Sequence, residues 1–187
     1  MTNQKDDYHI KRVLEGHADA FTPLVEKYKD MVFTLALRLL KNREEAEEVA
    51  QDVFVKSYQS LSGFKGKSRF ATWLYSITYN ACMDVIKRKK KYIISEDISM
   101  LNDTRVIQEE DALSFLIKHD RNEAVNQTVA KLPEEDRAII WCYYFEELSV
   151  KEIAKVVNLS PSNVKVKLHR SRKRLYTLLE RNALIKE

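Results

Sequence analysis

Residues 148–165 read LSVKEIAKVVNLSPSNVK, and this stretch has the pattern of two short helices joined by a turn. Ser149 and Glu152 have the spacing of a capping box, in which two side chains bond the free backbone N–H groups at a helix start. Asn158 tolerates a left-handed turn, and Ser160, with proline after it, can begin a second helix. The stretch therefore predicts a helix-turn-helix unit.

The predicted unit has a small apolar core and a basic second helix. The core would be formed by Ile153, Val157, Leu159, Val164 and Leu168. Between Lys151 and Arg181 there are nine basic and two acidic residues, and cations beyond the first turn of the second helix can meet phosphates and base edges. An ordinary helical hairpin with a basic face is the alternative, but the coincidence of caps, turn and charge favours DNA binding.

The rest of the chain also has helical periodicity. Only three glycines and three prolines interrupt 187 residues, and apolar residues recur three and four apart. We therefore predict an all-α protein with two small helical domains, residues 1–91 and 120–187, joined by an acidic linker over residues 92–119. The expected helices cover residues 5–15, 19–40, 42–61, 69–89, 124–132, 134–146, 149–157 and 161–179. Gly16 can end the first, and Asn42 with Glu45 forms a second expected capping box.

A basic and aromatic segment closes the first predicted domain. The sequence FATWLYSITYN (residues 70–80) lies between the loop SGFKGKS (residues 62–68) and the run KRKKK (residues 87–91). Aromatic side chains beside cations suit unpaired bases, because any base can stack on them. The apolar members, however, have core spacing: Phe70, Trp73, Leu74 and Ile77. Asn80 and the loop are thus the better candidates for contact with DNA.

Several classes of protein do not fit the sequence. The first residues are polar, and no apolar run approaches the roughly 20 residues of a membrane span, so we expect a cytoplasmic protein. Cys82 and Cys142 lie far apart in apolar helical stretches and are expected to be buried free thiols. The four histidines lack ligand spacing, and no nucleophile–base pair is evident. We expect no metal, no cofactor and no enzymatic activity.

An ordered set of motifs resembles the extracytoplasmic-function (ECF) sigma factors of bacterial RNA polymerase. The matching stretches are Asp19-Ala20-Phe21, residues 44–54 (EEAEEVAQDVF), Phe64, residues 70–74 (FATWL), Ile77 with Asn80, residues 132–137 (LPEEDR) and the helix-turn-helix. Their order and spacing match across nearly the whole chain. The resemblance implies a factor that binds core RNA polymerase, recognises the −35 and −10 promoter elements and promotes DNA melting.

The resemblance also implies roles for individual residues. The polymerase-binding set, which would dock on the clamp of the largest subunit, is Glu44, Glu47, Glu48, Gln51, Asp52 and Lys56. The −10 set is Phe64, Lys65, Lys67, Arg69, Asn80, Lys87 and Arg88. The −35 set is Ser162, Asn163, Lys165, Lys167, His169, Arg170, Arg172, Lys173 and Arg174. Many relatives have Gly-Thr at residues 162–163 and a small polar residue in place of Val166, so the −35 sequence stays open.

Two other readings of the chain remain. A regulator with a helix-turn-helix output and a helical sensor domain would bind duplex DNA without polymerase, but has no evident need for the basic, aromatic segment over residues 64–91. The chain could also be a nucleic-acid enzyme, but the sequence has no paired carboxylates and no metal-ligand cluster in the spacing that such an enzyme needs. Members of the family are often held by an anti-sigma factor, commonly membrane-bound, so such a partner is expected. The acidic linker between basic surfaces also predicts that the two domains can pack together.

Overall fold

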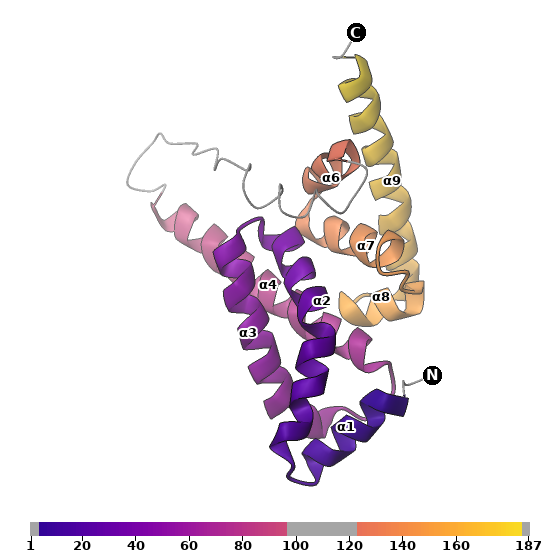
Figure 1. The fold of residues 1–187 in the computed structure, drawn as a ribbon. Helices are drawn as coiled ribbons and strands as arrows, with labels where there is room; N and C mark the ends of the chain where they lie inside the picture. Colours follow the sequence, from indigo (N-terminus) through magenta and orange to yellow (C-terminus); the bar gives the residue numbers. More distant parts are fainter. Residues whose placement is uncertain (1–3, 97–122, 185–187) are drawn as a thin grey trace.

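The computed structural model describes residues 4–96 and 123–184, and every regular element within these ranges is a helix (Figure 1). The N-terminal half contains α1 (Gln4–Leu14), the 3-10 turn η1 (Ala18–Phe21), α2 (Thr22–Leu40), α3 (Arg43–Gln59), the 3-10 turn η2 (Leu61–Gly63) and α4 (Phe70–Glu96). The C-terminal half contains α6 (Glu123–Ala130), α7 (Glu134–Tyr144), α8 (Val150–Val156) and α9 (Pro161–Leu184). The predicted all-α class is confirmed.

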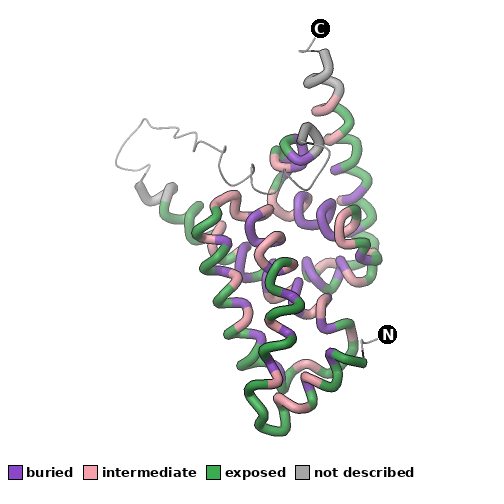
Figure 2. Tube along the Cα trace, viewed as in Figure 1, coloured by how far each residue is buried: buried purple, intermediate pink, exposed green. Residues whose placement is uncertain are grey.

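Helices α2, α3 and α4 pack against one another and form the core of the N-terminal half. The apolar stripe of α2 is buried, with Val32 and Leu35 fully enclosed, and it meets Val53 of α3 and Leu74 of α4. Gly16 follows α1 with a φ of +99°, as its expected role as a helix terminator requires. Figure 2 shows that the buried positions of these helices face inward and the exposed positions face outward.

Two local expectations for the N-terminal half were wrong. Helix α4 does not end near Lys89 but continues to Glu96, because no glycine or proline occurs between residues 67 and 132 to stop it. The first residues of the predicted linker are therefore helical, and residues 97–119 lie outside the described part of the chain. Asn42 does cap α3, accepting from the Glu45 N–H over 3.0 Å. The Glu45 carboxylate, however, pairs with Lys89 instead of returning to the cap.

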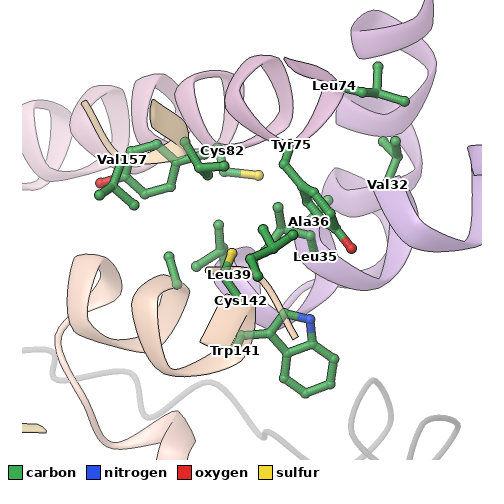
Figure 3. Packing of buried hydrophobic residues seen from close by; sticks show 14 of the residues in the cluster. Val32, Leu35, Ala36, Leu39, Leu74, Tyr75, Cys82, Trp141, Cys142 and Val157 are labelled. Carbon is green, nitrogen blue, oxygen red and sulfur yellow. The ribbon is translucent and has the colours of Figure 1, made fainter. Parts of the chain in front are cut away.

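The two halves pack against each other, as expected. Helix α8 lies on α4, and α7 lies against α2 (Figure 1). The buried residues of both halves form one cluster, in which Tyr75 and Cys82 of α4 meet Trp141, Cys142 and Val157 of the C-terminal half (Figure 3). Both cysteines are buried free thiols, as predicted. Burial of apolar side chains thus holds together the two parts of the chain that the sequence predicts as separate domains.

Candidate nucleic-acid interface

The C-terminal half forms the predicted helix-turn-helix from α8 and α9. The Ser149–Glu152 capping box is complete at the start of α8, and Asn158 adopts the left-handed conformation with a φ of 53°. The Asn163 N–H donates to the Ser160 hydroxyl over 3.2 Å at the start of α9. Of the five predicted core residues, all are buried except Leu159, which is half-buried. The local signals therefore fix both the helix ends and the angle at which α9 leaves the unit.

One face of α9 is exposed and basic. The exposed residues of the predicted −35 set are Ser162, Asn163, Lys165, His169, Arg170, Arg172, Lys173 and Arg174. The side chains of Arg170, Lys173 and Arg174 line a shallow groove of about 420 Å³ along the helix. The opposite side is buried through Val164 and Leu168. The free face can therefore enter a DNA groove without disturbing the core.

Lys167 and Arg172 have a different environment from the other α9 cations. Lys167 pairs with Glu135 at 2.5 Å and Asp136 at 3.3 Å, and the hydrogen bond to Glu135 raises the pKa of Lys167. Arg172 donates to the Tyr144 hydroxyl over 2.6 Å. All these partners lie on α7, so both cations attach α9 to the rest of the domain. The sequence offers one signal for this: Lys167 follows Val164 by three residues and lies at the edge of the buried stripe.

The loop before α4 is supported by an aromatic cluster. Phe64 is half-buried, and its ring lies 5.6 Å from that of Phe70 and 5.2 Å from that of Trp73, centroid to centroid. Phe70 and Leu74 are core residues as predicted, whereas Trp73 and Ile77 are only partly buried.

Lys65 and Lys67 are exposed on the loop, and Gly66 between them has a φ of +65°, a backbone conformation that suits glycine. The loop thus presents cations on a rigid aromatic base.

Asn80 does not lie beside this loop. It is exposed on α4, ten residues after Phe70, which corresponds to about 15 Å along a helix axis. It lines a groove of about 470 Å³ between α3 and α4, together with Lys56 and Asp84. Lys87 and Arg88 line the continuation of that groove, about 660 Å³, with Glu48 and Asp52 among the facing residues. The structure therefore brings Asn80, Lys87 and Arg88 together with part of the predicted polymerase-binding set.

The predicted polymerase-binding set forms the outer face of α3. Each of its members is exposed: Glu44, Glu47, Glu48, Gln51, Asp52 and Lys56. Arg43 pairs with Glu47 at 2.8 Å and offsets part of the negative charge at the start of the helix. The other side of α3 is buried through Ala46, Val49 and Val53. An acidic, solvent-facing helix side is available for a partner protein.

The structure adds a contact that sequence reasoning missed, between the loop before α4 and the first helix of the helix-turn-helix. Arg69 pairs with Glu152 at 2.7 Å, and the Thr72 hydroxyl lies 3.3 Å from the same carboxylate oxygen. The Lys155 ammonium donates to the Lys67 carbonyl over 2.8 Å. The only signal in the sequence for the Arg69–Glu152 pair is the opposite charge of the two residues. Glu152 already has a role in the capping box of α8, so the sequence gives no reason to expect a second partner for it.

A second missed contact joins α7 to the end of α2. The Arg137 guanidinium, which is 7% exposed, donates to the carbonyl oxygens of Arg38 and Leu39 over 3.1 and 3.2 Å. It also donates to the Leu132 carbonyl. The last carbonyls of a helix lack partners within it, so Arg137 completes α2 from the other half of the chain.

The described part of the chain contains neither a metal-binding cluster nor a helix that could span a membrane. Along residues 4–96 and 123–184, no three His, Cys, Asp or Glu side chains come together in a way that could hold a metal ion. The helices of that same part of the chain are too short or too polar to cross a membrane.

Comparison with known proteins places these features in one family. The model of Sigma-70 region 2 matches residues 24–92, and that of Sigma-70, region 4 matches residues 122–175. The chain is 33% identical to the ECF RNA polymerase sigma factor SigW of Bacillus subtilis, over 89% of this chain and 92% of SigW. It is 30% identical to the RNA polymerase sigma-H factor of Pseudomonas aeruginosa, over 96% of each chain.

A solved structure agrees in fold. The sigma factor RpoE of Bartonella quintana, determined in complex with the anti-sigma factor NepR, superposes with a TM-score of 0.67 at 17% identity, covering 86% of this chain and 96% of RpoE. Region 2 corresponds to the α2–α4 core and region 4 to the helix-turn-helix half. The chain belongs to the extracytoplasmic-function group of bacterial RNA polymerase sigma factors.

Proposed function

We propose that this sigma factor binds core RNA polymerase through the exposed acidic face of α3 and contacts promoter DNA at two places. The free face of α9 reads the −35 element as duplex, with Lys165 and Arg170 near base edges and Lys173 and Arg174 at phosphates. The loop before α4 and the Asn80 groove receive the −10 element. The observation that carries this proposal is the presence, in one chain, of an exposed basic face on α9 and a separate acidic face on α3.

We propose that the same arrangement promotes melting of the promoter. Extruding a base from the duplex costs a few kcal/mol, and a pocket that offers stacking and an edge to bond offsets that cost. Asn80 provides both a donor and an acceptor, and the loop provides cations for other phosphates of the same strand. Contacts between polymerase and DNA would offset more of the free-energy cost of melting, because they hold the DNA in place. We propose no chemical step, because an initiation factor of this kind leaves catalysis to the polymerase.

We also propose that an anti-sigma factor binds this chain and keeps it from polymerase. The support is the likeness in fold to RpoE, whose structure was determined with the anti-sigma factor NepR. The expected partner would cover the outer face of α3, since that face is the one the polymerase needs. Competition between a candidate partner and core polymerase for the purified chain tests this point directly.

Reconstitution tests the main proposal. The purified chain is added to core polymerase with random-sequence promoter libraries, and transcribed sequences are selected. Enrichment of a two-part motif with a constant spacer supports the proposal. A chain that binds duplex DNA but never directs transcription by core polymerase would instead act as a regulator with a helix-turn-helix output.

A further inference from the structure

Val166 is an apolar side chain on the basic face of α9. It is 47% exposed and lies outside the buried cluster of the protein. The buried residues Val164 and Leu168 come two residues before and two residues after it, and a step of two residues turns an α-helix by about 200°. Val166 therefore lies opposite the buried side, in the middle of the face assigned to the −35 element. The predicted −35 set contains only polar and charged residues and omits it.

The fold does not explain a valine at this position. A β-branched side chain loses χ1 freedom in a helix, so valine is a poorer helix former than alanine, lysine or glutamate. At 47% exposure, Val166 also leaves apolar surface in water. Its exposed neighbours one turn away on the same face are hydrophilic, among them Asn163, His169 and Arg170. Single exposed apolar residues are common on proteins, but this one stands at the centre of a surface that meets DNA under the proposed function.

The major groove offers an apolar side chain one specific partner. Each base pair presents a pattern of donors and acceptors there, and thymine alone adds a 5-methyl group. A valine can pack on that methyl group, which removes both apolar surfaces from water. It cannot bond the amino group of cytosine or the O6 and N7 atoms of guanine, which would lose water without gaining a partner. An apolar residue on a reading helix thus favours thymine by contact and disfavours a G·C pair by desolvation.

We propose that Val166 reads one thymine of the −35 element by packing on its 5-methyl group. This inference rests on the assignment of α9 to the −35 duplex under the proposed function, and it adds a base that the chain prefers. Arg170 lies one turn after Val166, about 6 Å along the helix axis, and base pairs stack about 3.4 Å apart. With α9 lying along the groove, the thymine is within about two base pairs of the pair that Arg170 contacts.

Replacing thymine with deoxyuridine tests the contact from the DNA side, because uracil lacks only the 5-methyl group and keeps every hydrogen-bonding atom. Holoenzyme assembled from the full chain and core polymerase is first used to select a preferred −35 element. Each thymine of that element, on either strand, is then replaced singly, and holoenzyme affinity is measured by competition with the unmodified promoter duplex. One replacement should lower affinity by about fourfold, the effect of no longer burying one methyl group, and the others should change it little.

Variants of α9 test the contact from the protein side. Val166→Ala removes both γ-methyl groups at an exposed site, so helix content by circular dichroism should stay the same. With this variant the sensitive deoxyuridine replacement should have no further effect, because the methyl group has already lost its partner. Arg174→Ala is the matched control. It should weaken binding by losing a phosphate contact but keep the full effect of deoxyuridine.

Loss of the deoxyuridine effect in Val166→Ala, with the effect retained in Arg174→Ala, supports the inference. Three results would overturn it: no thymine within reach of the pair contacted by Arg170, no thymine that is sensitive to deoxyuridine, or an equal effect in the wild type and Val166→Ala.

The basic residues of α9 separate this inference from the function on which it rests. If Arg170→Ala and Arg174→Ala weaken binding to the −35 element while deoxyuridine has no effect, the assignment of α9 stands and the role of Val166 is wrong. If both variants leave holoenzyme affinity for that element unchanged, α9 does not read the duplex, and the assignment is wrong together with the inference.

Discussion

Arg137 of α7 bonds the carbonyl oxygen of Leu39 in the last turn of α2 over 3.2 Å, across the boundary between the two halves of the chain. Replacing Arg137 with methionine leaves buried carbonyls without a donor. We expect the free energy of unfolding to fall by about 2–4 kcal/mol, measured by urea denaturation. Arg170→Met, the same substitution at an exposed position, should change it by less than about 0.5 kcal/mol. Equal effects of the two changes would mean that Arg137 does not stabilise the packing of the two halves.

Charge reversal on α3 should separate polymerase binding from folding. Glu48→Lys with Asp52→Lys is expected to weaken binding to core polymerase by about tenfold or more, with helix content by circular dichroism unchanged. Asp7→Lys on α1 with Glu15→Lys directly after it makes the same charge change and should have little effect, since both positions are exposed and lie outside the proposed interface. Undiminished binding by the α3 variant would move the polymerase contact elsewhere.

Cations of α9 should differ in what their loss does to DNA binding. Arg170→Ala should weaken −35 duplex binding and relax sequence preference by roughly 1–3 kcal/mol. Arg174→Ala should weaken binding to all sequences alike and reduce the salt-dependence slope by about one. Lys167→Ala should mainly lower stability, because Lys167 is paired with Glu135 and Asp136. Affinity at several salt concentrations, together with urea denaturation, distinguishes these three behaviours.

Asn80 is expected to act on unpaired DNA only. Asn80→Ala should leave duplex −35 binding intact and reduce permanganate reactivity of promoter thymines in the holoenzyme, because the amide that bonds an extruded base is lost. Gln59→Ala, on the other side of the same groove, controls for a general change in that surface. Normal promoter opening by the Asn80 variant, with normal discrimination among −10 sequences, would place the base pocket elsewhere.

Alkaline pH should lower the free energy of unfolding through ionisation of Tyr79. Burial, followed by the nearby Glu135 carboxylate, raises the pKa of Tyr79 to about 12. Since the folded-state pKa exceeds the unfolded value of about 10, its contribution is complete below pH 10 and is lost as pH rises toward 12. Each pH unit in that window removes about 1.4 kcal/mol. Tyr79→Phe should flatten the fall when unfolding free energies are compared between pH 9 and 11, and a slope that stays the same would assign the loss to other groups.

The sequence predicts the helix-turn-helix well because its signals are local. Caps such as Ser149–Glu152 and the turn at Asn158 act over three or four residues, and both form as expected. The contact between Arg69 and Glu152 joins residues far apart in the chain, and no local pattern specifies it. The expected end of α4 at residue 89 was wrong because a change of composition after the lysine run does not by itself stop a helix, and the backbone continues to Glu96.

Lys165 and Lys167 are lysines of the same helix, but their surroundings differ. Lys165 is exposed, whereas Lys167 is half-buried against α7. Similarly, the predicted −10 set divides into the loop and the Asn80 groove because the length of α4 separates them. Residue types in the sequence therefore indicate which segments carry charged surfaces. The helix faces determine which of those side chains lie on the same surface.

The tie between Lys167 and the two carboxylates of α7 also bears on how related factors can diverge. Positions such as Lys165, His169 and Arg170 can change without cost to the fold, because they contribute nothing to the core. A change at Lys167 removes the cation that pairs with Glu135 and Asp136, so we expect it to lower stability unless α7 changes as well. New promoter preferences are therefore expected to arise at less cost to the fold through the exposed positions of α9 than through Lys167.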